Sequence, residues 1–201
     1  MALGTAPAPY ELRFDSGRSC LDLVATNHPV ERLDSVERLR AWLAGTGLVP
    51  AGVPLPGAGP QWLAAFHELR HHIGQLVRGE IDGPPFAGAA AAVALDRVNA
   101  LAAAPPPAPC AIRAADGTLV RVLRGDPGCA ALVAAVARDT VDLLTDPVAR
   151  ALLRQCEGDN CSIVYLDTSR GRRRRWCSSE VCGNRERVAR HRRRVAAVGR
   201  E

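Results

Sequence analysis

The feature of this sequence that most constrains its fold is a set of four cysteines near the C-terminus. Cys156 and Cys161 form one C-x4-C pair, and Cys177 and Cys182 form a second pair of the same spacing after fifteen intervening residues. Two matched cysteine pairs separated by a short segment are typical of one tetrahedral zinc site. Four thiolate ligands leave no open coordination position, so we expect one structural Zn²⁺ per chain. Two disulfides are the alternative interpretation.

The sequence favours a cytoplasmic protein over a secreted or membrane protein. Met1–Pro9 lacks the cationic start and apolar core of a signal peptide. No run of about 18 apolar residues is present, so we expect no membrane-spanning helix. The remaining cysteines, at positions 20, 110 and 129, stand in apolar surroundings and are expected to be small buried side chains. This cysteine usage fits a reducing compartment better than a disulfide scaffold.

Positive charge is concentrated at the same end of the chain as the four cysteines. All 26 cationic side chains are arginine, and thirteen of them lie between Arg154 and Arg200, against six acidic residues in 154–201. This asymmetry indicates two parts with different roles, so we expect one domain over 1–150 and a zinc module over 151–201. A structural metal within so much positive charge points first to nucleic acid as the partner.

The larger part is expected to be a mainly helical α+β domain with a small antiparallel hairpin. Gln61–Arg78 has the apolar spacing of an amphipathic helix, and Ser35 is placed to cap a shorter helix before it. Asp116 and Gly117 lie between two short apolar runs, which is the pattern of a β-hairpin turn. The apolar run Ser19–Thr26 is compatible with either a strand or a helix.

The zinc module is expected to have a treble-clef-like order of knuckle, hairpin and helix. Cys156–Cys161 contains turn residues and can form the knuckle. Ser162–Leu166 and Arg172–Trp176 are the two strands that we expect to pair next. A helix then runs to about Val198, with Cys182 in its first turn as the last ligand.

The expected C-terminal helix has two different faces. Val181, Val188 and Val195 recur every seven residues and form an apolar stripe. Arg187, Arg190, His191 and Arg194 recur at i, i+3, i+4 and i+7 on roughly the opposite side, as a cationic ridge suited to DNA phosphates or groove edges. The arginine run before the helix adds to this ridge. The expected nucleic-acid-binding residues are therefore Arg172, Arg173, Arg174, Arg175, Arg187, Arg190, His191 and Arg194.

One stretch of the zinc module resembles a known family. Arg174-Arg-Trp-Cys-Ser178 is followed by Cys182-Gly-Asn-Arg185 and preceded by Leu166-Asp-Thr-Ser-Arg170, which is similar to the CGNR zinc finger over about residues 150–195. By this resemblance the four cysteines are the zinc ligands. Trp176, Gly183, Asn184 and Arg185 are expected to brace the finger. The alternative is that Asn184 and Arg185 reach DNA and that Trp176 stacks on a base.

The N-terminal half is similar to the ABATE domain that usually precedes this finger. The matching pieces are Phe14-x-x-Gly17-x-x-Cys20-Leu-Asp-Leu23, then Trp42-Leu43 and Gly47-Leu48. The family is regarded as stress-linked transcriptional regulators, so the resemblance implies regulation rather than catalysis.

The leading hypothesis is therefore a double-stranded-DNA-binding regulator that is not an enzyme. A finger that binds RNA or an acidic protein is one alternative, and a small-molecule binder or enzyme within residues 1–150 is another. His67-Glu-Leu-Arg-His71 matches the H-E-x-x-H motif of zinc peptidases, but no third ligand stands out downstream. The sequence leaves open whether the larger domain binds a small-molecule ligand, forms a homodimer, or does both.

Overall fold

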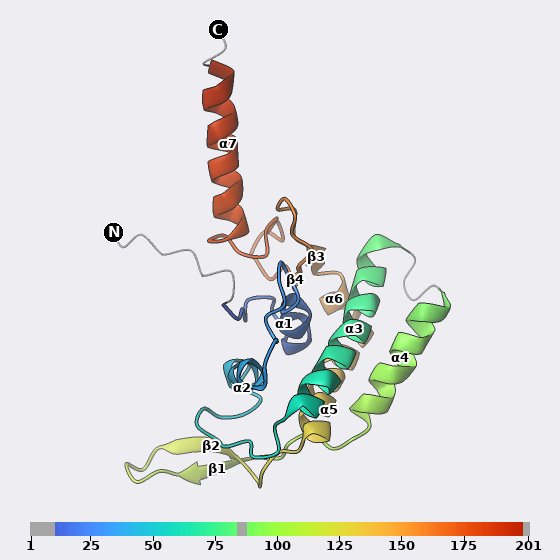
Figure 1. The fold of residues 1–201 in the computed structure, drawn as a ribbon, viewed down its shortest axis with the longest axis vertical. Helices are drawn as coiled ribbons and strands as arrows, with labels where there is room; N and C mark the ends of the chain where they lie inside the picture. The colour runs from blue at the N-terminus through green and yellow to red at the C-terminus, as the bar shows by residue number, and fades with distance from the viewer. Residues whose placement is uncertain (1–10, 84–87, 199–201) are drawn as a thin grey trace.

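A computed structural model describes residues 11–83 and 88–198 of the chain. In these residues helices dominate, with two small antiparallel sheets of two strands each (Figure 1). The elements, in chain order, are α1 (Ser19–Ala25), α2 (Val36–Gly45), α3 (Pro60–Asp82), α4 (Ala89–Ala102), β1 (Pro109–Arg113), β2 (Leu119–Leu123), α5 (Cys129–Thr145), α6 (Pro147–Arg150), β3 (Leu153–Gln155), β4 (Val164–Leu166) and α7 (Cys182–Val198).

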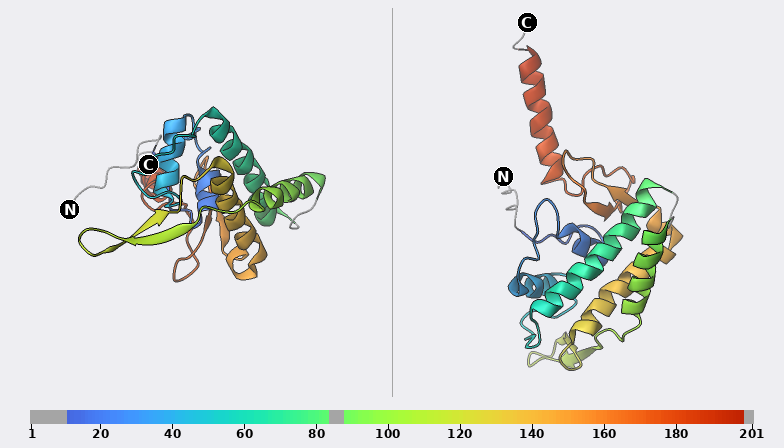
Figure 2. Two further views of the ribbon diagram at one scale, coloured as in Figure 1. Left: turned by 90° about the horizontal axis from the view of Figure 1, so that it is seen from below. Right: turned by 45° about the vertical axis from the view of Figure 1, so that its right-hand side comes forward.

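The expected α+β class is confirmed, and the elements form a body with two projections. Helices α3, α4 and α5 pack against one another as the body. Helix α7 extends away from this body, and the β1–β2 hairpin projects at the opposite end of the molecule (Figures 1 and 2). None of the described helices is both long and apolar enough to cross a membrane.

The run Ser19–Thr26, which the sequence left open between strand and helix, forms helix α1, and this helix packs against the body. All of its residues from Cys20 to Ala25 are buried, against α3, α5 and β4. A carboxylate of α5 caps its N-terminus: Asp139 Oδ2 accepts hydrogen bonds from the Cys20 amide at 2.8 Å and from Ser19 Oγ at 2.9 Å. Helix N-termini have unsatisfied amides and favour negative charge, so this contact fixes α1 against α5.

The predicted amphipathic helix is confirmed as α3, and its apolar face forms much of the core. Phe66 meets Trp42 of α2 edge to face, with ring centroids 5.7 Å apart and both side chains fully buried. The predicted cap of α2 is also present, because Ser35 Oγ accepts a hydrogen bond from the Arg38 amide at 3.3 Å.

The predicted hairpin is confirmed as β1–β2. Gly117 occupies the turn with φ 86°, a conformation that glycine adopts without a steric penalty. Apolar side chains on this hairpin remain exposed, including Ile112 and Leu119. Of the three cysteines outside the zinc module, Cys20 is buried as expected, whereas Cys110 in β1 and Cys129 in α5 are only partly buried.

The hairpin of the zinc module differs from the expected one. Strand β4 pairs with β3, so the turn Cys156–Cys161 lies between these two strands. The expected return strand Arg172–Trp176 was wrong, since these residues form a loop. Their backbone groups bond elsewhere: the Arg174 amide donates to Asp167 Oδ2, and the Arg175 carbonyl accepts from the Glu157 amide, both at 2.9 Å.

The zinc module packs directly against the helical body. Leu153, Val164 and Leu166 of the β3–β4 hairpin belong to the same apolar core as the N-terminal helices. In the other direction, Ala25 of α1 packs into the small cluster around the four cysteines. The Leu166 amide also donates to the Ser16 carbonyl at 2.9 Å. The base of the finger is therefore held by the larger domain.

Candidate metal centre and basic helix

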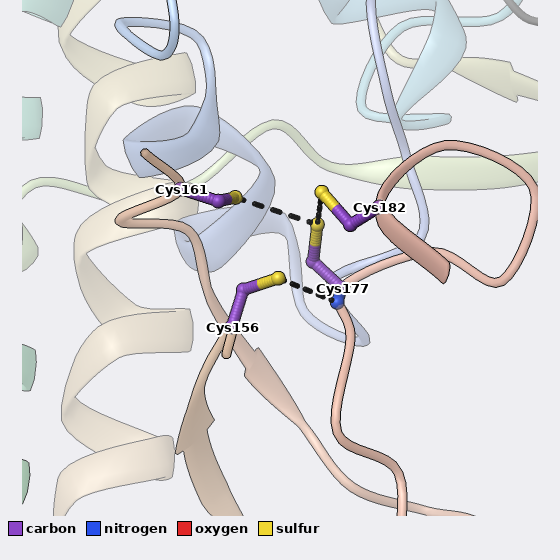
Figure 3. A group of neighbouring side chains, drawn as sticks. All are labelled: Cys156, Cys161, Cys177 and Cys182. Atoms are coloured by element: carbon purple, nitrogen blue, oxygen red, sulfur yellow. Dashed lines mark hydrogen bonds between the residues drawn. The ribbon is translucent and has the colours of Figure 1, made fainter. Parts of the chain in front are cut away.

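The four cysteines converge as the sequence predicts. Their Sγ atoms all lie within 4.8 Å of one another, and the side chains point toward a common centre (Figure 3). Cys177 Sγ is 3.8 Å from Cys161 Sγ and 3.7 Å from Cys182 Sγ. Zinc bound tetrahedrally at about 2.3 Å from each sulfur places neighbouring sulfurs about 3.8 Å apart. The site therefore fits one structural Zn²⁺, whose coordination shell the four thiolates close.

Each ligand is delivered by a different piece of local structure. Cys156 directly follows β3, Cys161 ends the turn, Cys177 ends the long loop, and Cys182 is the first residue of α7. Zinc binding therefore ties the start of α7 to the β3–β4 hairpin. Because α7 projects beyond the body, this tie is what sets the direction of the helix.

Backbone amides support the first ligand. Cys156 Sγ accepts hydrogen bonds from the Cys177 amide at 3.3 Å and from the Gly158 amide at 3.4 Å. Hydrogen bonds from the thiols of Cys161 and Cys177, together with these amides, hold the pKa of Cys156 below its ordinary value. A thiolate is the form that binds zinc, so the knuckle is arranged for metal binding.

Gly158 also leaves room for the metal site. A Cβ atom at this position would lie 3.1 Å from Cys182 Cβ and 3.4 Å from its Sγ. The sequence predicts only that this glycine belongs to the turn Cys156–Cys161. The close approach of the second cysteine pair cannot be seen from the turn sequence alone.

A residue of the N-terminal segment reaches the metal site, although no motif in the sequence predicts this contact. Arg13 Nη1 lies 3.4 Å from Cys177 Sγ, and Nη2 donates to the Cys177 carbonyl at 3.3 Å. The same guanidinium pairs with Asp15 at 2.7 Å, and the Arg13 side chain is only 9% exposed. Nothing in the local sequence marks Arg13, since its partner lies 164 residues away.

Asp167 is a second residue that contributes to the site and that the sequence did not predict. Its buried carboxylate accepts from Ser169 Oγ at 2.6 Å, the Ser169 amide at 3.0 Å and the Arg174 amide at 2.9 Å. These bonds, led by the one from Ser169, hold the pKa of Asp167 below its ordinary value. The carboxylate thus organises the loop that leads to Cys177.

The residues expected to brace the finger are placed around the start of α7. The Gly183 amide donates to the Ser178 carbonyl at 2.9 Å, and a Cβ at Gly183 would contact the Trp176 ring at 3.5 Å. Arg185 Nη1 lies 3.5 Å from the Asp159 carbonyl of the knuckle. Asn184 is exposed and borders a cavity beside the helix.

The four consecutive arginines have different surroundings. Arg172 and Arg173 are exposed, and neither forms an ion pair within the described part of the chain. Arg174 turns inward, with its guanidinium 4.5 Å from the Tyr165 ring centroid, its Nε donating to the Trp176 carbonyl at 2.9 Å and its Nη2 bonded to the Cys177 carbonyl. Arg175 pairs with Glu157 at 2.6 Å.

The predicted cationic ridge lies on α7 and is open to solvent. Arg187, Arg190, His191 and Arg194 are all exposed. On the apolar stripe, Val181 packs against the cysteine cluster, whereas Val188 and Val195 are exposed. The helix that carries the ridge extends away from the body (Figure 1).

The H-E-x-x-H motif on α3 does not assemble a metal site. His67 Nε2 donates to the Leu33 carbonyl at 2.8 Å, and Glu68 pairs with Arg97 at 2.7 Å. Among the described side chains, the four cysteines are the only group of three or more His, Cys, Asp or Glu residues within metal-binding distance. His67 and Glu68 therefore connect α3 to the segments that carry Leu33 and Arg97.

Two known protein families match this sequence, one over each part of the chain. The sequence pattern of the ABATE family, described as "Putative stress-induced transcription regulator", matches residues 17–147. That of the CGNR zinc finger matches residues 152–195. No curated protein matches the chain. The chain therefore belongs to the ABATE family and carries a CGNR zinc finger at its C-terminal end.

Proposed function

We propose that this protein is a transcriptional regulator that binds double-stranded DNA through α7. The observation that carries the proposal is the exposed ridge of Arg187, Arg190, His191 and Arg194 on a helix that begins at a zinc ligand and projects from the body. A helix anchored at one end and free along its flank can enter the major groove, which is wide enough to admit an α-helix.

Phosphate contacts account for most of the expected affinity. The ridge contributes three arginines, and the loop adds the exposed Arg172 and Arg173. Contact with about five phosphates gives a slope near −4 to −5 for log K against log salt. Base contacts must add to these if the protein selects a sequence.

The proposal assigns different tasks to the two parts of the chain. Residues 151–201 bind DNA, and residues 1–150 hold the finger and fix the direction of α7. Arg174 serves the finger itself, because its side chain already bonds two carbonyls of the loop. Arg175 can reach a phosphate after it releases Glu157.

The proposal is tested by fluorescence anisotropy of a labelled duplex with the full zinc-loaded chain. Arg190→Gln combined with Arg194→Gln should weaken binding at least tenfold and reduce the salt slope by about 2. The matched control is Arg97→Gln combined with Arg138→Gln, which removes the same charge from α4 and α5 and should change affinity less than twofold. Equal losses in both double variants would contradict an interface on α7.

The same assay separates DNA from the other partners considered. Labelled single-stranded RNA and a labelled acidic peptide are titrated under identical salt. Tighter binding of the single-stranded RNA than of duplex DNA would replace the proposal with an RNA-binding role, because a single strand has no major groove for a helix to enter.

A further inference from the structure

Residues 168–175, between β4 and Cys177, form a short loop with arginines at its tip, called the arginine loop below. Arg170, Arg172 and Arg173 are all exposed at this tip. The Arg172 amide donates to the Ser169 carbonyl at 3.0 Å, which closes a tight turn, and Arg172 has φ 48°. A left-handed backbone is rare for a residue with a long side chain and persists only where surrounding contacts hold it. The tip is therefore fixed in one conformation.

Both ends of the arginine loop are anchored to the finger. At its start, the buried Asp167 carboxylate accepts from the Ser169 amide at 3.0 Å and from the Ser169 hydroxyl at 2.6 Å. At its end, the Arg174 amide donates to the same carboxylate at 2.9 Å, and the Arg174 guanidinium lies 4.5 Å from the Tyr165 ring centroid. Because its ends are fixed, the loop loses little backbone freedom when its tip binds a partner.

The arginine loop meets the ridge of α7 at the base of the helix. Gly183 lies four residues before Arg187 on the same face of α7, and a Cβ at Gly183 would lie 3.5 Å from the Trp176 ring. The Arg175 guanidinium lies 5.3 Å from the centroid of that ring. Arg187 Nη2 also donates to the Ser179 carbonyl at 3.3 Å. The ridge and the arginine loop are therefore two ends of one basic surface.

A hollow of about 440 Å³ lies where the end of the arginine loop meets the residues just before α7. Arg173, Arg175, Ser178 and Ser179 line it, together with the carboxylates of Asp15 and Glu180. Asp15 pairs with Arg13 at 2.7 Å, so its charge is already balanced. Guanidinium and hydroxyl groups are common donors to the sugar-phosphate backbone of DNA. The hollow is therefore suited to one DNA strand that passes between the ridge and the loop.

We propose that the arginine loop enters the minor groove of DNA, next to the major groove that α7 occupies, which rests on the proposed function. The sugar-phosphate strand between the two grooves then lies over the hollow. The minor groove of B-DNA is about 6 Å wide, so it admits side chains but no helix. Runs of A·T pairs narrow this groove and make its potential more negative, which attracts inserted arginines. The preferred partner is therefore duplex DNA with an A·T-rich segment beside the bases under α7.

Base analogues test this proposal because they change one groove at a time. Replacing adenine by 2,6-diaminopurine adds an amino group in the minor groove, as in a G·C pair, and leaves the major-groove edge of the A·T pair unchanged. The full zinc-loaded chain is titrated by fluorescence anisotropy with two labelled duplexes of A·T pairs only, one of which contains diaminopurine throughout. We expect the adenine duplex to bind at least fivefold more tightly. Equal affinities for the two duplexes would overturn the proposal.

Matched double substitutions separate the arginine loop from the ridge. Arg172→Gln combined with Arg173→Gln should bring the affinities for the two duplexes to within twofold of each other. Arg190→Gln combined with Arg194→Gln removes the same charge from α7, and should weaken binding of both duplexes while keeping the ratio of their affinities. A ratio that survives the loop substitutions would overturn the proposal. A ridge variant that binds both duplexes normally would instead contradict the proposed function, and leave the preference of the loop for adenine to be judged by its own variant.

Asp167→Asn tests whether the anchoring of the loop matters. The amide group retains an acceptor on only one side, so it no longer holds both Ser169 and Arg174. The substitution also raises the net charge by one, so a surface that acts through charge alone should bind both duplexes at least as tightly and with the same ratio. We expect the ratio to fall at least twofold in a variant that still binds one zinc per chain. An unchanged ratio would overturn the role of the anchored tip.

Discussion

The guanidinium of Arg13 lies 3.4 Å from the Sγ of Cys177, so the N-terminal segment takes part in the metal site of a finger that lies 164 residues further along the chain. A charged donor at this distance stabilises a thiolate, and hydrogen bonds to charged groups contribute about 1.5–3 kcal/mol. The zinc affinity of the finger therefore depends on the body to which it is docked.

Replacing Arg13 should weaken zinc binding. Arg13→Gln removes the charge next to Cys177 while keeping a polar side chain, and we expect roughly a tenfold loss of zinc affinity, measured by competition with a chromophoric chelator. The control is Arg40→Gln in α2, which also removes one positive charge. Arg40 forms an exposed ion pair with Glu37. Equal zinc affinity in the two variants would contradict a role for Arg13 at the site.

Loss of one ligand should remove the metal and loosen the start of α7. Cys182→Ser is expected to lower the bound zinc from one ion per chain to well below one after dialysis, because a structural site depends on all four thiolates. Helicity measured by circular dichroism should fall with it. Cys110→Ser, in β1 and outside the cluster, should retain a full equivalent of zinc.

Gly158 should tolerate no side chain even though its turn position looks permissive. In Gly158→Ala the new Cβ lies 3.1 Å from Cys182 Cβ, so the two cysteine pairs must move apart and zinc affinity should fall several-fold. Gly171→Ala lies in the same finger, where the nearest atom is 3.9 Å away, and should leave the affinity unchanged. Identical zinc affinities for the two variants would contradict this, because the knuckle would then accept the extra methyl group without loss of metal binding.

Asp22 in α1 should make stability depend on pH. Burial raises the pKa of this carboxyl from 3.8 to about 6, although Ser16 donates a backbone hydrogen bond to it. The folded state therefore holds a proton that the unfolded state releases between about pH 4 and pH 6. Stability falls as pH rises through this window and stays lower above it.

Asp22→Asn keeps the acceptor for the Ser16 amide and removes the buried charge. The variant should exceed the unsubstituted chain in unfolding free energy by about 2–3 kcal/mol at pH 7.5 and by less at pH 5. Urea unfolding at the two pH values checks this, and the comparison between the two proteins cancels the effect of pH on zinc binding. A difference that does not change with pH would contradict the raised pKa.

The elements predicted correctly from sequence are those set by local chemistry. Ser35 caps α2, Gly117 supplies the turn of the β1–β2 hairpin, and the spacing of the four cysteines predicts their convergence. In each case the residues that decide the structure lie within a few positions of one another or have a chemistry with few alternatives.

The features that were missed depend on contacts between distant segments. Arg172–Trp176 reads as a strand, but Asp167 satisfies the Arg174 amide, and Leu153 pairs with Leu166 instead. The contact of Arg13 with Cys177 and the closeness of Gly158 to Cys182 likewise arise only after the finger is docked. No pattern in a single segment carries that information.

Selection of sheared genomic DNA on the purified zinc-loaded protein tests whether α7 reads a DNA sequence. Bound fragments are sequenced after washing at about 150 mM salt, where binding by phosphate contacts alone is weakened. We expect an enriched sequence motif upstream of genes, which is lost in the double variant Arg190→Gln, Arg194→Gln. Uniform recovery of the genome, or none, would contradict a sequence-specific regulator that reads DNA through α7.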